Sequence, residues 1–314
     1  MNTHSNAVPE SSLDSKAVAP PLMSATRPLY WSVRRELWEN RSIYIAPLGA
    51  AGVYMFGFLI SLVWVSHRYR RLVPPHTEPP LIQVAMNYAH AGMLLTFTAF
   101  LVGIFYSLDA LHGERRDRSI LFWKSMPVSD LTTVLSKASI PLVVLPVIVF
   151  ALTVPLQFAM RVLTTAALLA RGGNVAAEWS LPLYQMQLGL LYGLIVMALW
   201  HAPIYCWFLL VSGWARRATF LWAVLPPLAL AAVEYIAFHT SHLGLLLQDR
   251  LFGFSYKAFD LVDKNGVPID AHFIPLSLFA PGRFLMSASL WIGLIFAAIF
   301  LFAAVRLRRY QGPM

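Results

Sequence analysis

Long stretches without Asp, Glu, Lys or Arg alternate with short charged segments along this chain. The charge-free stretches run over Ser42–Ser66, Pro79–Leu108, Ala138–Met160, Trp179–Ala215, Ala218–Val233 and Phe284–Val305. A helix needs about 20 mainly apolar residues to cross the hydrocarbon core of a bilayer. The pattern therefore predicts six membrane-spanning helices, at about 43–66, 84–108, 138–160, 184–213, 218–238 and 285–305.

The composition supports a membrane protein and excludes an ordinary soluble domain. Hydrophobic residues make up 58% of the 314 positions and charged residues only 12%, against about 25% charged in soluble domains. We therefore expect an all-α polytopic membrane protein with one six-span domain over 28–314. Residues 1–27 are rich in Ser, Ala and Pro, lack the apolar core of a signal peptide, and are expected to form a disordered cytosolic tail.

Lys and Arg residues favour one orientation of the six spans. With the N-terminus in the cytosol, the inner segments carry 15 of the 24 Lys and Arg residues and the outer segments carry 9. This bias predicts that both termini are cytosolic. The expected location is a cell membrane, with a bacterial inner membrane as the specific expectation. Arg68, Arg70 and Arg71 lie on the outer side and run against the rule. The net charge is +9, and anionic lipid headgroups are a sufficient partner for the basic residues. Nucleic acid is therefore not expected as a partner.

The segment between the second and third predicted spans is the most informative part of the sequence. Its charges alternate in sign from Glu114 to Arg118, and these two residues lie four apart, so they can pair on a helix. Ser119 can cap a short helix that Pro127 ends, and Ser129 or Asp130 can cap the next helix. The segment is either a docking element for a cytosolic protein or an interfacial loop whose aromatic residues lie among lipid headgroups.

Glu114 to Ser129, with its acidic and basic pairs and its closing Ser-Met-Pro-Val-Ser, resembles the cytosolic loop after the second span of ABC-2 type transporter permeases. The six-span layout, the amphipathic segment 29–41 before the first span and the long outer segment before the last span share this resemblance. Many family members carry Gly-Thr where this chain has Arg118-Ser119.

The resemblance implies a fold and a set of partners. It implies a permease subunit with re-entrant outer helices before the last span, paired with a second permease subunit as a homodimer or heterodimer. Separate ATP-binding cassette ATPase subunits would hold the ATP and Mg, since this chain has no Gly-x-x-x-x-Gly-Lys-Ser/Thr loop. The implied cargo is amphiphilic and exported. The implied ATPase-docking residues are Glu114, Arg115, Arg116, Asp117, Arg118, Ser119, Phe122, Trp123, Lys124 and Pro127.

Polar residues inside the predicted spans are candidates for a translocation path, because such groups are costly in lipid. They are Asn87, His90, His201 and Glu234. The alternative is structural: hydrogen bonds between helices for the first three, and a partner on a neighbouring span or at the outer interface for Glu234. Gly189 and Gly193 allow close helix packing, which would fit a dimer contact.

Other classes of function are less well supported by the sequence. An ATP-independent secondary transporter usually shows two repeated halves, and no repeat is visible. A polytopic membrane enzyme needs catalytic residues at a defined spacing, and no such motif occurs in the spans. His239, His242 and the distant Asp249 do not form a convincing metal-binding pattern, so no metal site is expected.

Overall fold

The computed structural model describes residues 26–72, 81–119, 128–170, 172, 175–260 and 276–310. Side chains are described within these ranges except at 26–27, 65–72, 81–84 and 177. The expected disordered tail at 1–27 lies outside this part except for its last two residues. These two residues belong to α1, which begins at Thr26 and ends at Glu39.

Six helices in the described part are long and apolar enough to cross a membrane, which makes the chain an all-helical multi-pass membrane protein. This confirms the number of spans predicted from the sequence. The spans are α2 (Ser42–Leu72), α3 (Leu81–Asp109), the continuous run of α6 (Asp130–Ser139), η1 (Ile140–Val144) and α7 (Leu145–Leu169), then α9 (Leu183–Trp214), α10 (Thr219–Phe238) and α14 (Ala288–Tyr310).

The third span is longer at both ends than the predicted range 138–160. It begins at Asp130 and ends at Leu169, because Lys137 and Arg161 have buried partners and therefore do not end the helix. The π-helical segment η1 contains Pro141, which cannot donate the usual helical hydrogen bond. Ser129 caps the start of α6 by accepting a hydrogen bond from Thr132 N at 3.1 Å, which confirms one of the two expected caps.

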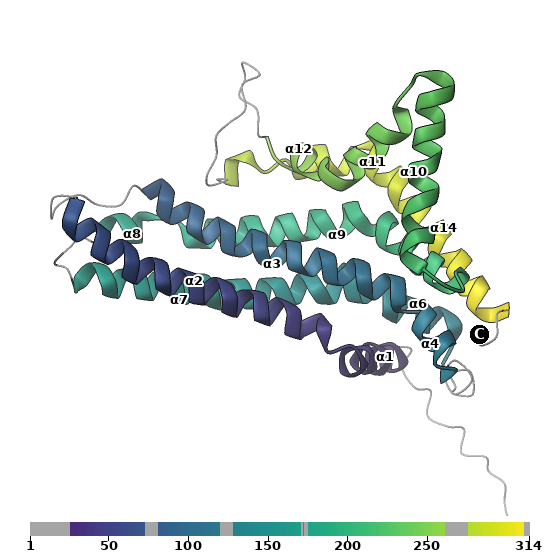
Figure 1. Ribbon diagram of the computed structural model, residues 1–314, viewed down its shortest axis with the longest axis horizontal. Helices are drawn as coiled ribbons and strands as arrows, with labels where there is room; N and C mark the ends of the chain where they lie inside the picture. Colours follow the sequence, from purple (N-terminus) through teal and green to yellow (C-terminus); the bar gives the residue numbers. More distant parts are fainter. Residues whose placement is uncertain are drawn as a thin grey trace, which may run out of the picture.

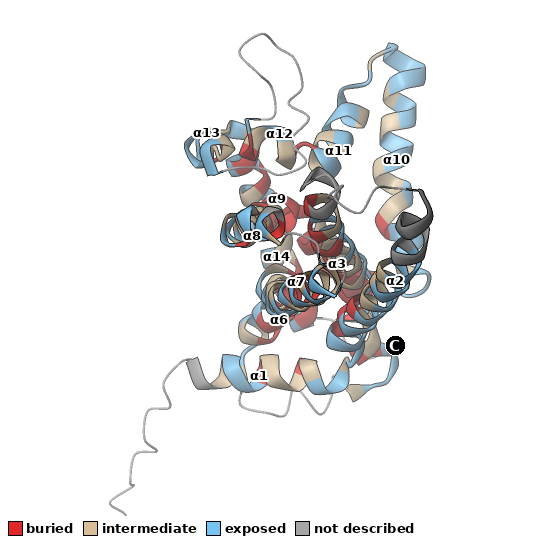
Figure 2. Cartoon of the chain, turned by 90° about the vertical axis from the view of Figure 1, so that its left-hand side faces the viewer, coloured by how far each residue is buried: buried red, intermediate tan, exposed pale blue. Residues whose placement is uncertain are grey.

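The helices α2, α3, α7 and α9 lie side by side as a bundle, and α14 crosses α9 obliquely (Figure 1). Figure 2, which looks along this bundle, shows the buried residues gathered at its centre and α10 standing to one side with most of its surface exposed. One end of the bundle carries α1, the short helix α4 (His112–Arg116) and the start of α6; we call it the α4 end. The opposite end carries α8 (Ala176–Ser180).

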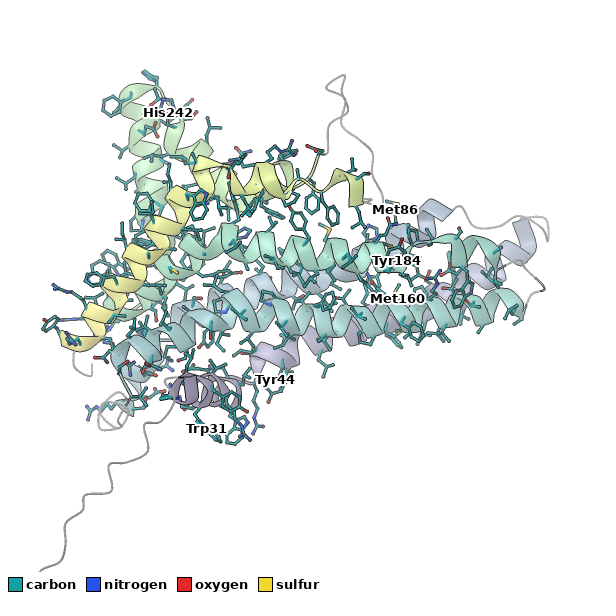
Figure 3. The ribbon with its side chains drawn as sticks, turned by 180° about the vertical axis from the view of Figure 1, so that it is seen from behind. Trp31, Tyr44, Met86, Met160, Tyr184 and His242 are labelled. Atoms are coloured by element: carbon teal, nitrogen blue, oxygen red, sulfur yellow. The ribbon has the colours of Figure 1, made fainter. Side chains whose placement is uncertain are left out.

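Short helices fill the segment between α10 and α14. They are α11 (His242–Phe252), α12 (Phe254–Ala258), the 3-10 turn η2 (Leu276–Leu278) and α13 (Pro281–Leu285). His242 lies at the tip of the α10–α11 hairpin, at the opposite edge of the molecule from Trp31 on α1 (Figure 3).

From that tip, α11 and α12 run along the flank of α9. Three side chains of α9 hold them there, because Trp200 Nε1 donates to Asp249 O at 3.0 Å, Tyr192 Oη donates to Ala258 O at 3.1 Å, and His201 Nε2 lies 3.2 Å from Leu251 O. These short helices therefore form part of the wall beside α9.

Candidate functional site

The short helix α4 is bound to the end of α9. Backbone N–H groups of Leu111 and His112 donate to Ser212 Oγ at 2.8 and 2.9 Å. Arg115 donates from its guanidinium to Gly213 O at 2.6 Å. Because α4 directly follows α3, these bonds make it a short bridge between α3 and α9.

Glu114 points from α4 into the protein and is 7% exposed. Its carboxylate lies 3.1 Å from Lys137 Nζ on α6 and 3.3 Å from Arg35 on α1, and it also pairs with Arg308 on α14. A buried carboxylate is stable as an anion only when such partners replace the lost water.

Glu36 on α1 is a second buried carboxylate, and only 1% of it is exposed. It accepts from Lys137 Nζ at 2.9 Å, from Arg35 at 2.7 Å and from the Tyr106 hydroxyl of α3 at 2.7 Å. Burial raises the pKa of the Glu36 carboxyl, but the charges of Lys137 and Arg35 outweigh this effect and lower the pKa to about 2.

These residues form one balanced group, which we call the charge cluster. Arg308 Nε lies 3.1 Å from Asp130 Oδ1 at the start of α6, which completes it. The charge cluster has three acids and three bases, Glu36, Glu114 and Asp130 with Arg35, Lys137 and Arg308. The exposed Glu39 pairs with Arg35 at its edge, 3.7 Å away. The charge cluster joins α1, α4, α6 and α14 at the α4 end of the bundle.

One residue of this cluster, Glu36, could have been recognised from the sequence. Glu36 lies on α1 between Val33 and Leu37, two residues that pack against the core, so helical spacing places it on the buried face. Nothing in the sequence identifies Lys137 and Arg308 as further members of the charge cluster, because they are far from Glu36 and Glu114 along the chain.

Six of the ten expected docking residues lie in the described part of the chain. Glu114 and Arg115 are buried and have partners inside the chain, so they do not present charges for another protein, and the expected Glu114–Arg118 pair is replaced by the charge cluster. Arg116, Asp117 and Arg118 are exposed, and Ser119 is half-buried. The remaining four, Phe122, Trp123, Lys124 and Pro127, lie outside the described residues.

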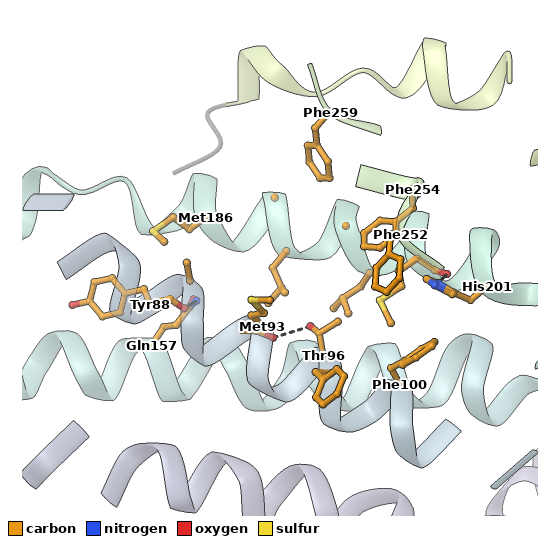
Figure 4. A pocket seen from close by; sticks show the side chains of 18 of the residues that line it. Tyr88, Met93, Thr96, Phe100, Gln157, Met186, His201, Phe252, Phe254 and Phe259 are labelled. Atoms are coloured by element: carbon orange, nitrogen blue, oxygen red, sulfur yellow. Dashed lines mark hydrogen bonds between the residues drawn. The ribbon is translucent and has the colours of Figure 1, made fainter. Parts of the chain in front are cut away.

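A cavity of about 620 Å³ lies between α3, α9 and the α11–α12 segment. We call it the flank cavity. Phe252, Phe254 and Phe259 point into it from the side of the short helices (Figure 4). Its walls are mostly apolar, and its polar lining residues are Tyr88, Thr96, Gln157 and His201. A cavity of this size with few polar groups is typical of a small-molecule site.

Only one of the four candidate path residues lines the flank cavity. His201 does so, with its ring edge against Phe100 at a centroid distance of 5.0 Å. Asn87 is half-buried and its backbone oxygen accepts from Tyr54 Oη at 2.6 Å, while His90 is exposed.

Glu234 has its partners in the segment that directly follows its own helix, α10. Its carboxylate accepts from Thr240 Oγ1 at 2.9 Å and from the backbone N–H groups of His242 and Leu243 at 2.9 and 2.7 Å. It therefore caps the start of α11 and does not line the flank cavity.

Gln157 is the residue at this site that sequence reasoning missed. It lies on α7, is 3% exposed and lines the flank cavity. Hydrogen bonds to α8 hold the helices in place at the end of the cavity near Gln157. The Tyr88 hydroxyl of α3 bonds to Glu178, and Arg161 of α7 donates to Glu178 O at 2.7 Å. Burial raises the pKa of the Glu178 carboxyl.

Gly189 and Gly193 face this chain's own short segments. A Cβ atom at Gly189 would lie 3.2 Å from Phe279 Cζ, and one at Gly193 would lie 3.9 Å from Phe259 Cζ. Their small size therefore allows the aromatic residues that follow α12 and η2 to approach α9, and this face of α9 is already occupied within the subunit.

The described residues thus define a multi-pass helical membrane protein with a buried charge cluster at one end and an apolar cavity on its flank. Within the described ranges, no group of three or more His, Cys, Asp or Glu side chains is placed to hold a metal ion. No protein-family model, curated protein or solved structure matches this chain.

Proposed function

We propose that this chain is the permease subunit of an ATP-binding cassette transporter, driven by a separate ATPase that docks at the α4 end. The observation that carries the proposal is the charge cluster, in which a helix of the loop after the second span is tied to α1, α6 and α14 by buried ion pairs. Displacement of α4 would therefore displace these helices with it, because separating buried opposite charges is costly.

The same helix is also positioned to act on the flank cavity. The wall of the cavity is formed largely by α3 and α9, and α4 is continuous with the first and bonded to the end of the second. A push on α4 would change the packing of α3 against α9. Nucleotide binding would be coupled to this movement because nucleotide-bound ATPase subunits contact one conformation of the permease more favourably than the other.

The exposed residues Arg116, Asp117 and Arg118 are the proposed contact surface for the ATPase. Arg116 and Asp117 form an ion pair of 3.1 Å with both side chains more than half exposed. Arg118 adopts a positive φ of 58°, the left-handed conformation that glycine adopts most easily. This supports the resemblance to ABC-2 permeases, many of which have Gly at this position.

The remaining parts of the proposal concern assembly and location. A second permease subunit is expected beside α10, whose large apolar residues are exposed along most of its length. ATP and Mg belong to the ATPase subunits. The complex is expected in a cell membrane, most simply a bacterial inner membrane, with both termini in the cytosol and with an amphiphilic cargo moving outwards.

Copurification tests the proposal directly. The full chain is isolated from its native membrane in mild detergent, and ATP hydrolysis and the identity of bound subunits are measured. We expect an ATP-binding cassette ATPase with wild type and its loss with Asp117→Lys. Asp260→Lys is the matched control, because Asp260 also forms a half-exposed ion pair, with Arg283, but on the flank. Absence of an ATPase from the wild-type preparation, or its retention by Asp117→Lys, would contradict the proposal.

A further inference from the structure

The polar side chain of the flank cavity that has an unused hydrogen-bonding atom is Gln157. Its Nε2 donates to Tyr88 O at 3.1 Å. A backbone carbonyl can only accept, so this contact fixes which end of the amide faces Tyr88. The other end, Oε1, is buried and has no partner among the described residues. Buried acceptors rarely remain unpaired in a folded protein.

The other polar lining groups have partners within the chain. The Tyr88 hydroxyl points away from the cavity and bonds to Glu178, and Thr96 Oγ1 donates to Gly92 O at 2.7 Å, the dashed line in Figure 4. His201 has Nδ1 at 2.9 Å from Met197 O and Nε2 at 3.2 Å from Leu251 O, and a neutral ring, which carries one N–H, donates to one of these two carbonyls. Among the polar atoms of the lining side chains, Gln157 Oε1 is the one that is buried without a partner in the described part of the chain.

The shape of the cavity restricts the rest of the ligand. Tyr88 and Phe100 both line it on α3, and their separation along a helix corresponds to about 18 Å. Its rim is apolar and open, with Met93 71% exposed, Phe97 56% exposed and Phe252 66% exposed. Among the described residues, its lining contains no Asp, Glu, Lys or Arg, so a charged head group would find no countercharge from them.

We propose that the flank cavity binds a single-chain amphiphile with an uncharged head group that carries an O–H or N–H donor. The donor meets Gln157 Oε1, and the chain lies along α3 past Met93 and Phe97 towards Phe100. The proposal that this amphiphile is the transported cargo rests on the permease role proposed above. The proposal that it binds in the flank cavity concerns this chain alone.

The experiment uses two photoreactive twelve-carbon probes with a diazirine in the chain, one an alcohol and the other its methyl ether. The full chain is placed in phosphatidylcholine nanodiscs without ATPase or nucleotide, and saturable labelling is mapped by mass spectrometry. We expect the alcohol to label α3 and α9 at a concentration about tenfold lower than the ether, because only the alcohol supplies a donor. Gln157→Met removes the acceptor at similar size and should make the two probes equal.

Two further variants keep the result interpretable. Thr96→Val changes a lining hydroxyl that is bonded within its own helix, so the preference for the alcohol should remain. Gly193→Leu adds a side chain at the cavity wall and should weaken both probes. Equal labelling by the two probes in wild type, a preference retained in Gln157→Met, or no saturable labelling would each overturn the proposal, and a bound water would then be the partner of Gln157.

The outcome is separable from the test of the permease role. If the chain is labelled selectively by the alcohol probe but copurifies with no ATPase, the binding site is supported and the proposed ATPase-driven transport is contradicted. Copurification of the ATPase without selective labelling would do the opposite.

Discussion

Replacing Glu114 by Gln tests whether the charge cluster holds the α4 end together. The change keeps the shape of the side chain and removes one of the three negative charges of the charge cluster, so its three bases face two acids. Lys137 and Arg308 are only 2% and 3% exposed, and they cannot recover full hydration. Breaking a buried ion pair from one side costs about 3–5 kcal/mol. Since Lys137 keeps Glu36 and Arg308 keeps Asp130, we expect a loss near the lower limit, about 3 kcal/mol.

The assay is reversible unfolding of the purified chain in mixed micelles with a denaturing detergent. Asp117→Asn is the control, because Asp117 is 64% exposed and exposed substitutions usually change stability by less than about 0.5 kcal/mol. Lys137→Met alone and combined with Glu114→Gln completes a double-mutant cycle. A coupling of about 1–3 kcal/mol between the two positions is expected for groups in direct contact.

Unfolding of Glu114→Gln at the same detergent concentration as Asp117→Asn would refute a stabilising role of the charge cluster. The comparison also separates two roles of the loop. Variants of Glu114 should impair the ATPase response by destabilising the α4 end, whereas variants of Asp117 should impair it in a chain of normal stability.

Three further changes test other parts of the structure. The pKa of Glu36 is lowered from 4.5 to about 2; its charged form therefore stabilises the fold above pH 4.5, and about 3 kcal/mol should be lost as the pH falls towards 2. Glu36→Gln should reduce this dependence in unfolding curves, and the Glu114 carboxyl, whose pKa is also lowered, accounts for the part that remains. Gly293→Ala would place a Cβ atom 2.6 Å from the guanidinium carbon of Arg250; we expect faster hydrogen exchange in α11 and α12, whereas Gly244→Ala, with no atom within 4 Å, should not show it. Glu234→Ala removes the acceptor for two N–H groups at the start of α11 and should increase exchange there, at a cost of about 1 kcal/mol; unchanged exchange would rule out the capping role.

The candidate site could be predicted from the sequence only in part. The charged loop after the second span was identified, but its first two charges, Glu114 and Arg115, point inward and only Arg116 to Arg118 remain on the surface. Position in a polar segment does not fix the direction of a side chain, which depends on the neighbouring helices. The same limit applies to Glu234, which a hydropathy profile cannot distinguish from a residue of a transport path.

The sequence by itself determined the class of protein and the places where the chain crosses a membrane. Transfer of a segment from water to hydrocarbon depends mainly on the sum over about 20 neighbouring residues, and that sum can be read along the chain. Only the tertiary structure decided which charges are paired and which acceptor is free. Glu114 and Arg308 are 194 positions apart, and the unused Gln157 Oε1 depends on a contact with Tyr88 on another helix. Ion pairs and hydrogen bonds require particular distances and directions, and packing of the helices is what sets them.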